Sequence, residues 1–219
     1  MAAASRESRM RSGTERGSAA EKTDCVVIAA GESRRMGKWK MLLPLEAEGE
    51  APATVVERSV RSALKACVRV ILVVGYRGGE LRRLFRGWKR VECVPNPAYA
   101  QGMFSSVKAG LRRVATDRCF LALGDMPLVS PDTYTEMLAA PPMDCVVPMY
   151  HGKRGHPVLM GFPVRRAVLG ADQEAILRDV LSEFPTLSVP VEDPHILTDL
   201  DTADDLERLG PGAGGTPSS

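Results

Sequence analysis

The sequence of 219 residues has no apolar run long enough to cross a membrane. A membrane-spanning helix needs about 18 or more consecutive apolar residues. The longest apolar runs here, at 26–30 and 70–74, have the length of strands. With 44% hydrophobic and 26% charged residues, the composition is that of a globular chain rather than a disordered or fibrous one. We therefore expect a folded protein with no membrane partner.

Cysteine is also scarce, and it follows no pattern. The five cysteines form no CxxC pair and have no close histidine spacing; they are Cys25, Cys67, Cys93, Cys119 and Cys145. An odd number without metal-type spacing argues against a disulfide framework and against a zinc site. Most of them stand in or beside apolar, β-like runs, so we expect small core residues in a reducing, cytoplasmic compartment.

The chain lacks a large excess of either charge. Its 29 Lys and Arg residues against 27 Asp and Glu residues give a net charge of +2, too small to indicate binding to nucleic acid. Residues 34–118 contain 18 basic and 7 acidic side chains, whereas residues 119–219 contain 6 and 15. For most of these side chains we expect solvated helix faces. The sharper alternative is a cleft in which the basic half binds a polyanion and the acidic half supplies metal ligands.

Neither end of the chain has the apolar content of a core. Residues 1–23 contain no apolar segment of the signal-peptide kind, and Glu7, Glu15 and Glu21 argue against a transit peptide. The last ten residues read GPGAGGTPSS. We expect disordered tails at 1–23 and 210–219 and a single domain at 24–209.

Between these tails, short β-branched runs alternate with amphipathic stretches. The pattern predicts strands at 25–31, 69–75, 91–96, 119–125, 145–149 and near 187–191, with another after the turn that begins at His151. It predicts helices at 55–66, 80–85, 105–114, 131–139, near 174–184 and near 203–209, with Ser130 as the cap of the helix at 131–139. Nearly continuous apolar strands are typical of a sheet covered on both faces. The expected fold is a single-domain, Rossmann-like α/β fold with a wound, mostly parallel sheet and helices on both faces.

The loop after the first strand has the residues of a phosphate site. Residues 29–45 read AAGESRRMGKWKMLLPL, in which small residues let backbone amides approach an anion and Arg and Lys neutralise it. The spacing from Gly31 to Gly37 is one residue too long for a Walker A loop, and Trp39 stands where Ser or Thr should follow. A basic surface loop is the alternative.

An acidic residue ends the fourth predicted strand. The string LALGDMP places Asp125 at the carboxyl edge of the sheet, where ligands gather in wound α/β folds. Magnesium takes oxygen ligands and often only one or two carboxylates, because phosphate oxygens and water complete its shell. Asp before Met-Pro is also typical of a turn, which is the structural alternative.

The longer pattern AAGxSxRMGxxKxLLPL resembles the signature of the molybdenum cofactor nucleotidyltransferases, a family with a GT-A-like nucleotide-binding fold, and GDMP resembles the metal motif of that family. The resemblance implies that Gly31, Arg35 and Lys40 hold a triphosphate, that Ala30 and Ser33 complete the loop, and that Arg35, Lys40 and Asp125 are the catalytic residues. Ala30 is typical of the cytidylyl branch of the family, whereas the guanylyl branch has a second Gly there.

Two further segments extend the resemblance. NPAYAQGMFSSVKAGL resembles the nucleotide-recognition segment and implies that Asn96, Gly102, Ser105 and Ser106 face the base or ribose. The alternative is an Asn-Pro turn followed by serines that cap a helix. For Ser105 alone, the two interpretations have equal weight. KRGHPVLM resembles the R-G-H-P-V-L-F motif, with Met160 in place of the aromatic residue, and implies that His156 lies on the pterin side of the cleft. A lone histidine is otherwise most often structural.

The closing segment TDLDTADDL resembles D-I-D-T-P-x-D-L, with Ala203 where Pro is usual. Thr202 and Asp205 also fit a variant of the capping box for a last helix. Either Asp199 or Asp201 is expected to join Asp125 at magnesium, and we favour Asp201.

As a whole, the resemblance implies transfer of CMP from CTP to the phosphate of molybdopterin or of the molybdenum cofactor, with release of pyrophosphate. The cofactor expected is Mg²⁺, and the partners expected are CTP, the pterin substrate and a recipient molybdenum hydroxylase. The alternatives are a guanylyltransferase of the same pathway, a nucleotidyltransferase acting on a sugar or alcohol phosphate, and a non-catalytic carrier of the cofactor.

Overall fold

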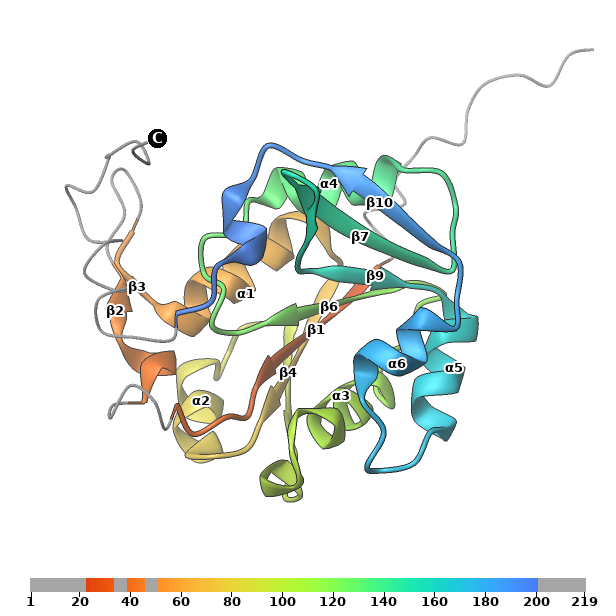
Figure 1. Cartoon of the computed structure of the whole chain (residues 1–219). Coiled ribbons are helices and arrows are strands. Elements are labelled where there is room, and N and C mark those ends of the chain that lie inside the picture. Colours follow the sequence, from red (N-terminus) through yellow and green to blue (C-terminus); the bar gives the residue numbers. More distant parts are fainter. Residues whose placement is uncertain (1–22, 34–38, 46–50, 201–219) are drawn as a thin grey trace, which may run out of the picture.

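The computed structural model describes residues 23–33, 39–45 and 51–200, and at its centre is a sheet of eight strands with helices against both faces (Figure 1). The strands are β1 (Asp24–Ala29), β4 (Arg69–Val74), β5 (Val91–Pro95), β6 (Cys119–Leu123), β7 (Cys145–Tyr150), β8 (Lys153–Arg154), β9 (Val158–Met160) and β10 (Thr186–Pro190). Their order is β10-β7-β9-β6-β1-β4-β5, and β8 pairs with β7. A separate hairpin is formed by β2 (Pro44–Leu45) and β3 (Ala53–Thr54).

Most strand pairs in the large sheet are parallel. β1 pairs in parallel with β4 and β6, β4 with β5, and β10 with β7. β9 lies antiparallel between β6 and β7. Every residue of β1 is buried, as expected for a central strand covered on both faces. The predicted fold class, an α/β fold with a wound and mostly parallel sheet, is confirmed.

The helices form two layers. One layer consists of α1 (Val55–Ala66), α2 (Gly78–Leu84) and α4 (Pro131–Ala139), and the other of α3 (Met103–Leu111), α5 (Phe162–Gly170) and α6 (Leu177–Ser182). Alternate residues of β1 face the two layers: Val27 belongs to the core beneath α1 and α4, and Val26 to the core beneath α3 and α5. Within the described residues, three short 3-10 helices lie in the connections: η3 (Lys40–Leu42), η4 (Tyr99–Gln101) and η5 (Pro194–Leu197).

Local sequence signals explain where the long helices begin. The Thr54 hydroxyl accepts from the Glu57 amide and the Glu57 carboxylate accepts from the Thr54 amide, which is a full capping box for α1. The Ser130 hydroxyl accepts from the Asp132 amide at the start of α4. The helices predicted at 55–66 and 131–139 have these same bounds. α3 begins at Met103 and ends at Leu111, earlier than the predicted 105–114, because Gly102 and not a serine is its N-cap.

Some elements differ from the prediction or lie outside the described residues. α5 and the β2–β3 hairpin were not expected. The helix expected near 203–209, the tail at 210–219 and all but Thr23 of the tail expected at 1–23 fall outside the described residues, so the division at 24–209 remains a prediction. Thr23 is buried and its carbonyl accepts from the Val68 amide. No helix in the described part of the chain is both long and apolar enough to span a bilayer.

All five cysteines are free thiols, and four are buried. Burial raises the pKa of Cys119 to about 12 and holds the pKa of Cys25 well above its usual value. Burial also raises the pKa of Cys93 and Cys145. A thiol must ionise to act as a nucleophile, so these side chains are poor reagents near neutral pH.

We therefore expect slow alkylation of the native protein by iodoacetamide, with Cys93, the least buried thiol, reacting first. Unfolding in guanidinium should expose all five to rapid modification. Cys119→Ala should lower the melting temperature before it changes activity, since a small cavity opens in the core. A native thiol that reacted as fast as a free peptide thiol, or zinc bound in a 1:1 ratio, would contradict this.

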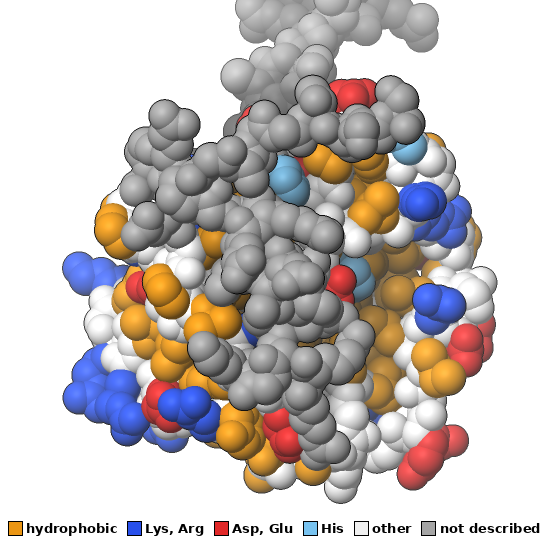
Figure 2. All heavy atoms as spheres, turned by 60° about the vertical axis from the view of Figure 1, so that its left-hand side comes forward, with side chains coloured by type: hydrophobic (Ala, Val, Ile, Leu, Met, Phe, Trp, Pro, Cys, Tyr) orange, Lys and Arg blue, Asp and Glu red, His pale blue; other side chains and the backbone are white. Residues whose placement is uncertain are grey.

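Figure 2 shows one group of Lys and Arg side chains at the lower left of the face it displays and others at its right. α2 and the turn after it carry the exposed basic side chains Arg82, Arg83, Arg86, Lys89 and Arg90. Most of the basic residues between 39 and 118 that the structure describes are exposed, as the sequence predicts. Lys40, Arg58 and Lys108 are exceptions, because they are buried.

Candidate functional site

A cavity of about 480 Å³ opens at the carboxyl ends of β1 and β6. Ligands bind at this edge in wound α/β folds, because helix N-termini and the loops after the strands converge there. Its walls come from the loop after β1, the segment between β5 and α3, the end of β6 and the segment before residue 200. The lining residues are Ile28, Ala30, Gly31, Glu32, Ser33, Lys40, Met41, Tyr99, Ala100, Gly102, Met103, Ser106, Leu123, Asp125 and Asp199.

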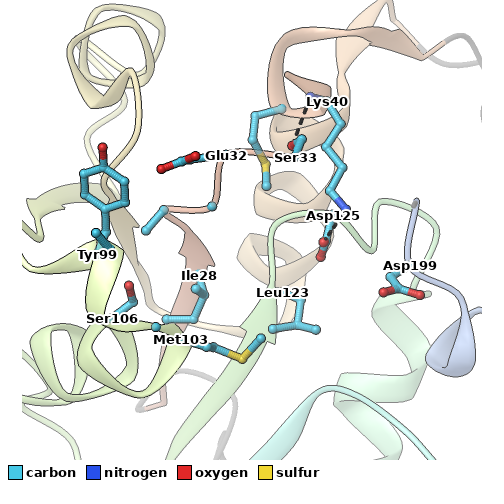
Figure 3. A pocket seen from close by; sticks show the side chains of 15 residues that line it. Ile28, Glu32, Ser33, Lys40, Tyr99, Met103, Ser106, Leu123, Asp125 and Asp199 are labelled. Carbon is cyan, nitrogen blue, oxygen red and sulfur yellow. Dashed lines mark hydrogen bonds and ion pairs between the residues drawn. The ribbon is translucent and has the colours of Figure 1, made fainter. Parts of the chain in front are cut away.

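Lys40 and Asp125 form an ion pair in this cavity. Lys40 Nζ lies 2.8 Å from Asp125 Oδ2 and donates to the Leu200 carbonyl at 2.6 Å (Figure 3). The lysine side chain is 8% exposed and the aspartate side chain 20%, so water screens the pair only partly. The site therefore holds a cation and a carboxylate next to each other. Lys40 comes from the basic segment 34–118 and Asp125 from the acidic segment 119–219.

The loop after β1 forms the adjoining wall. Ala30, Gly31 and Ser33 line the cavity, as the resemblance implies. The Ser33 hydroxyl accepts from the Lys40 amide at 3.3 Å, which joins the two ends of the loop. Arg35, the third residue expected to act in catalysis, lies outside the described residues.

The opposite wall carries the segment expected to recognise the nucleoside. Gly102 and Ser106 line the cavity, and Figure 3 shows Tyr99 and Ser106 on the side away from Lys40 and Asp125. Asn96 and Ser105 are buried and do not line it. Asn96 Nδ2 donates to the hydroxyls of Ser105 and Ser106, both at 2.9 Å. Asn96 therefore lies behind the wall and orients a hydroxyl that faces the cavity.

Tyr99 approaches the strand ends closely because Gly75 has no side chain. A Cβ atom at Gly75 would lie 2.6 Å from Tyr99 Cβ and 2.8 Å from the Ala30 carbonyl oxygen. Glycine at this position allows the tyrosine to stand beside the first strand and form part of the cavity wall.

His156 is half-buried and is not among the lining residues. Burial lowers its pKa, although a hydrogen bond with the Leu121 backbone and the negative charges of Asp125 and Asp199 oppose the shift. Its Nδ1 atom has no hydrogen-bond partner among the described atoms. The structure thus places the imidazole near both carboxylates but behind the wall, and a direct contact with substrate stays a prediction.

The donor set of the cavity fits a hard divalent cation. Asp125 and Asp199 both line it and present carboxylate oxygens. The described residues contain no group of three His, Cys, Asp or Glu side chains placed to hold a metal ion. A cation bound between phosphate oxygens and one or two carboxylates needs no such group. Asp201, the residue favoured from the sequence, lies outside the described residues.

Several lining residues were missed by the sequence analysis. Glu32, Met41, Tyr99 and Met103 line the cavity; they stand inside the segments quoted above, but none of them was named as a candidate site residue. Glu32 stands inside the phosphate loop, so its position alone was a usable signal. Tyr99 stands three residues before Gly102 in a segment that follows a strand end, and an aromatic ring in such a segment is a signal for a base or ring contact.

Comparisons with known proteins agree with this geometry. The protein-family model of the MobA-like NTP transferase domain matches residues 25–188. The molybdenum cofactor cytidylyltransferase of Escherichia coli strain K12 is 37% identical over 183 residues, which cover 84% of this chain and 93% of that protein. A probable molybdenum cofactor guanylyltransferase of Mycolicibacterium paratuberculosis is 32% identical over 117 residues, covering 52% of this chain and 54% of that one.

A solved structure extends the likeness to the fold. The crystal structure of Rv0371c from Mycobacterium tuberculosis H37Rv superposes with a TM-score of 0.71 at 27% identity, covering 86% of this chain and 97% of that chain. The family match spans most of the described sheet and every lining residue of the cavity except Asp199. The chain is therefore a nucleotidyltransferase that belongs to the family of MobA-like NTP transferase domains.

Proposed function

We propose that this protein transfers CMP from CTP to the terminal phosphate of molybdopterin or of the molybdenum cofactor and releases pyrophosphate. The observation that carries the proposal is the Lys40–Asp125 pair in a cavity at the ends of β1 and β6. The choice of CTP is supported by Ala30 and by the greater coverage of the cytidylyltransferase relative.

The reaction needs no general base and no covalent intermediate. The attacking phosphate is already anionic, so the protein has to align it with the α-phosphorus and neutralise the charge of the leaving pyrophosphate. The Lys40 ammonium, partly withdrawn from water, is suited to the second task. On the opposite wall, Ser106 and the Tyr99 ring are suited to hold the nucleoside.

We propose Mg²⁺ as the metal, held by Asp125 together with Asp199 or Asp201. When bound, it would supply Lewis-acid stabilisation of phosphate oxygens and orient the triphosphate. Asp125 Oδ2 is paired with Lys40, so Lys40 holds the carboxylate in a fixed orientation before substrate binds.

Pyrophosphate release, measured with each of the four nucleoside triphosphates and with or without molybdopterin, tests the proposal. We expect release to require both CTP and the pterin, and mass spectrometry to detect the pterin linked to CMP. Preference for GTP would assign the protein to the guanylyl activity of its second relative. Release that depended on a sugar or alcohol phosphate instead of the pterin would change the acceptor.

The alternative from another class of function is a non-catalytic carrier of the finished cofactor. Tight binding of the finished cofactor with no turnover of any triphosphate would favour it. Delivery of the product to a recipient molybdenum hydroxylase is compatible with catalysis, and we propose that both take place in the cytoplasm, where the free cysteines remain reduced.

A further inference from the structure

Trp39 is a buried aromatic residue next to Lys40 that no step of the proposed reaction uses. Its side chain is 7% exposed and packs in the core beneath α1, outside the cavity. The indole Nε1 donates a hydrogen bond to the Gly31 carbonyl at 3.2 Å. The bond therefore joins the residue before the lysine to the residue that begins the phosphate loop.

Two groups on the neighbouring strand connection hold the indole in place. The Tyr76 ring meets it edge to face, with ring centroids 6.0 Å apart. The Arg77 guanidinium lies 4.8 Å from the centroid of the indole ring, and Arg77 is itself held by two hydrogen bonds to Glu80, of 2.6 and 2.8 Å. Such edge and cation contacts fix the plane of an aromatic ring. The direction in which Nε1–H points is therefore set by the fold.

Side-chain packing leaves the orientation of the Gly31 carbonyl unconstrained. Glycine adopts many backbone conformations, and a Cβ at Gly31 would meet nothing within 4 Å, so packing does not fix this peptide. The preceding carbonyl, that of Ala30, accepts from the Tyr76 amide at 3.1 Å. Two successive carbonyls are thus held, one by a backbone donor and one by a side chain.

Fixing the Gly31 carbonyl also fixes the amide on the other side of the same peptide. The peptide joining Gly31 to Glu32 is trans and planar, so its N–H points opposite to its C=O. The carbonyl points to the indole in the core, and Gly31 and Glu32 line the cavity. Backbone amides oriented in this way bind phosphate oxygens.

We propose that Trp39 is a positioning residue whose indole N–H holds the Gly31–Glu32 peptide with the Glu32 amide directed to the phosphates of the bound nucleotide. It acts through the peptide and does not itself touch substrate. The inference rests on the proposed function in one respect, namely that the ligand of the cavity carries a polyphosphate.

The test compares Trp39→Phe with the parent protein in calorimetric titrations with CTP, pyrophosphate and cytidine. Phenylalanine keeps an aromatic ring against Tyr76 and Arg77 but removes the donor. We expect CTP and pyrophosphate to bind about five- to tenfold more weakly, the effect of one lost hydrogen bond, while cytidine affinity is unchanged. A merely structural role would weaken all three ligands together or none.

Two further variants keep the result interpretable. Trp39→3-benzothienylalanine replaces the indole N–H by sulfur at nearly constant shape, so it tests the donor even if Trp39→Phe folds poorly. Trp88→Phe is the matched control, because Trp88 packs on Phe85 with ring centroids 5.0 Å apart and lies outside the cavity lining. It should leave all three affinities unchanged.

The outcomes separate this inference from the proposed function. Parent-like binding of CTP and pyrophosphate by both Trp39 variants would overturn the positioning role and leave the transfer reaction standing. If the parent used GTP and both Trp39 variants still bound pyrophosphate more weakly than the parent, the positioning role would stand and the choice of CTP would fail. If the parent bound neither CTP nor pyrophosphate, both would fail.

Discussion

Asp125→Asn is expected to lose nearly all CMP transfer, by about 100-fold or more, while CTP affinity stays measurable. The amide keeps the shape of the carboxylate but removes its charge, so magnesium binding weakens more than contacts between the lysine and the triphosphate. Activity should recover in part when magnesium is raised. Steady-state rates of pyrophosphate release across a magnesium titration, together with CTP binding by calorimetry, measure both effects.

Asp132→Asn is the matched control. Asp132 is an exposed residue in the first turn of α4, so its neutralisation should cost little stability and no activity. If Asp125→Asn transferred CMP normally at ordinary magnesium concentrations, Asp125 would be only a turn residue. The metal would then have to be sought at Asp199 and Asp201.

Lys40→Ala is expected to lower turnover by two to three orders of magnitude, because a charged contact to the transition state is worth roughly 3 kcal/mol. Lys40 also bonds to Asp125 and to the Leu200 carbonyl, so a moderate fall in melting temperature should accompany the loss. The protein should remain folded by circular dichroism. The resemblance predicts the same direction of change for Arg35→Ala.

Lys65→Ala serves as control for the removal of a lysine. Lys65 lies exposed in the last turn of α1 and should be replaceable without loss of turnover. Parent-like turnover by folded Lys40→Ala would show that the triphosphate is neutralised elsewhere, and the phosphate-site interpretation of the loop would be wrong.

The sheet was predictable because its strands are nearly continuous apolar runs, a pattern that few other structures produce. α1 and α4 were predictable to the residue since Thr54 with Glu57, and Ser130 with Pro131, mark their first turns. α5 has Pro163 in its first turn but no side-chain cap, because its N-cap is Gly161, and Val164 and Val168 are its only buried residues. The β2–β3 hairpin has two residues in each strand, too few for an alternating pattern.

The candidate site was predictable where a residue follows a strand, and less so where tertiary packing decides. Gly31, Lys40 and Asp125 stand in loops that the order of the strands brings to one edge, and all three line the cavity. Asn96 also follows a strand, β5, but its side-chain amide points away from the cavity and donates to the hydroxyls of Ser105 and Ser106. Which way such a side chain turns depends on donors and acceptors that meet only in the folded protein.

The position of Leu200 bears on when the site matures during synthesis. Its carbonyl accepts from Lys40 Nζ, its amide donates to the Asp125 carbonyl at 3.0 Å, and its side chain is buried against Leu45 and Val55. A nascent chain that has been synthesised as far as Asp125 does not yet contain Leu200. The ribosome needs roughly 4–15 s to add the residues between Asp125 and Leu200. Until then the lysine and the aspartate have no common anchor. In a growing chain, the loop after β1 is therefore synthesised well before the contacts that tie Lys40 and Asp125 to Leu200 can form.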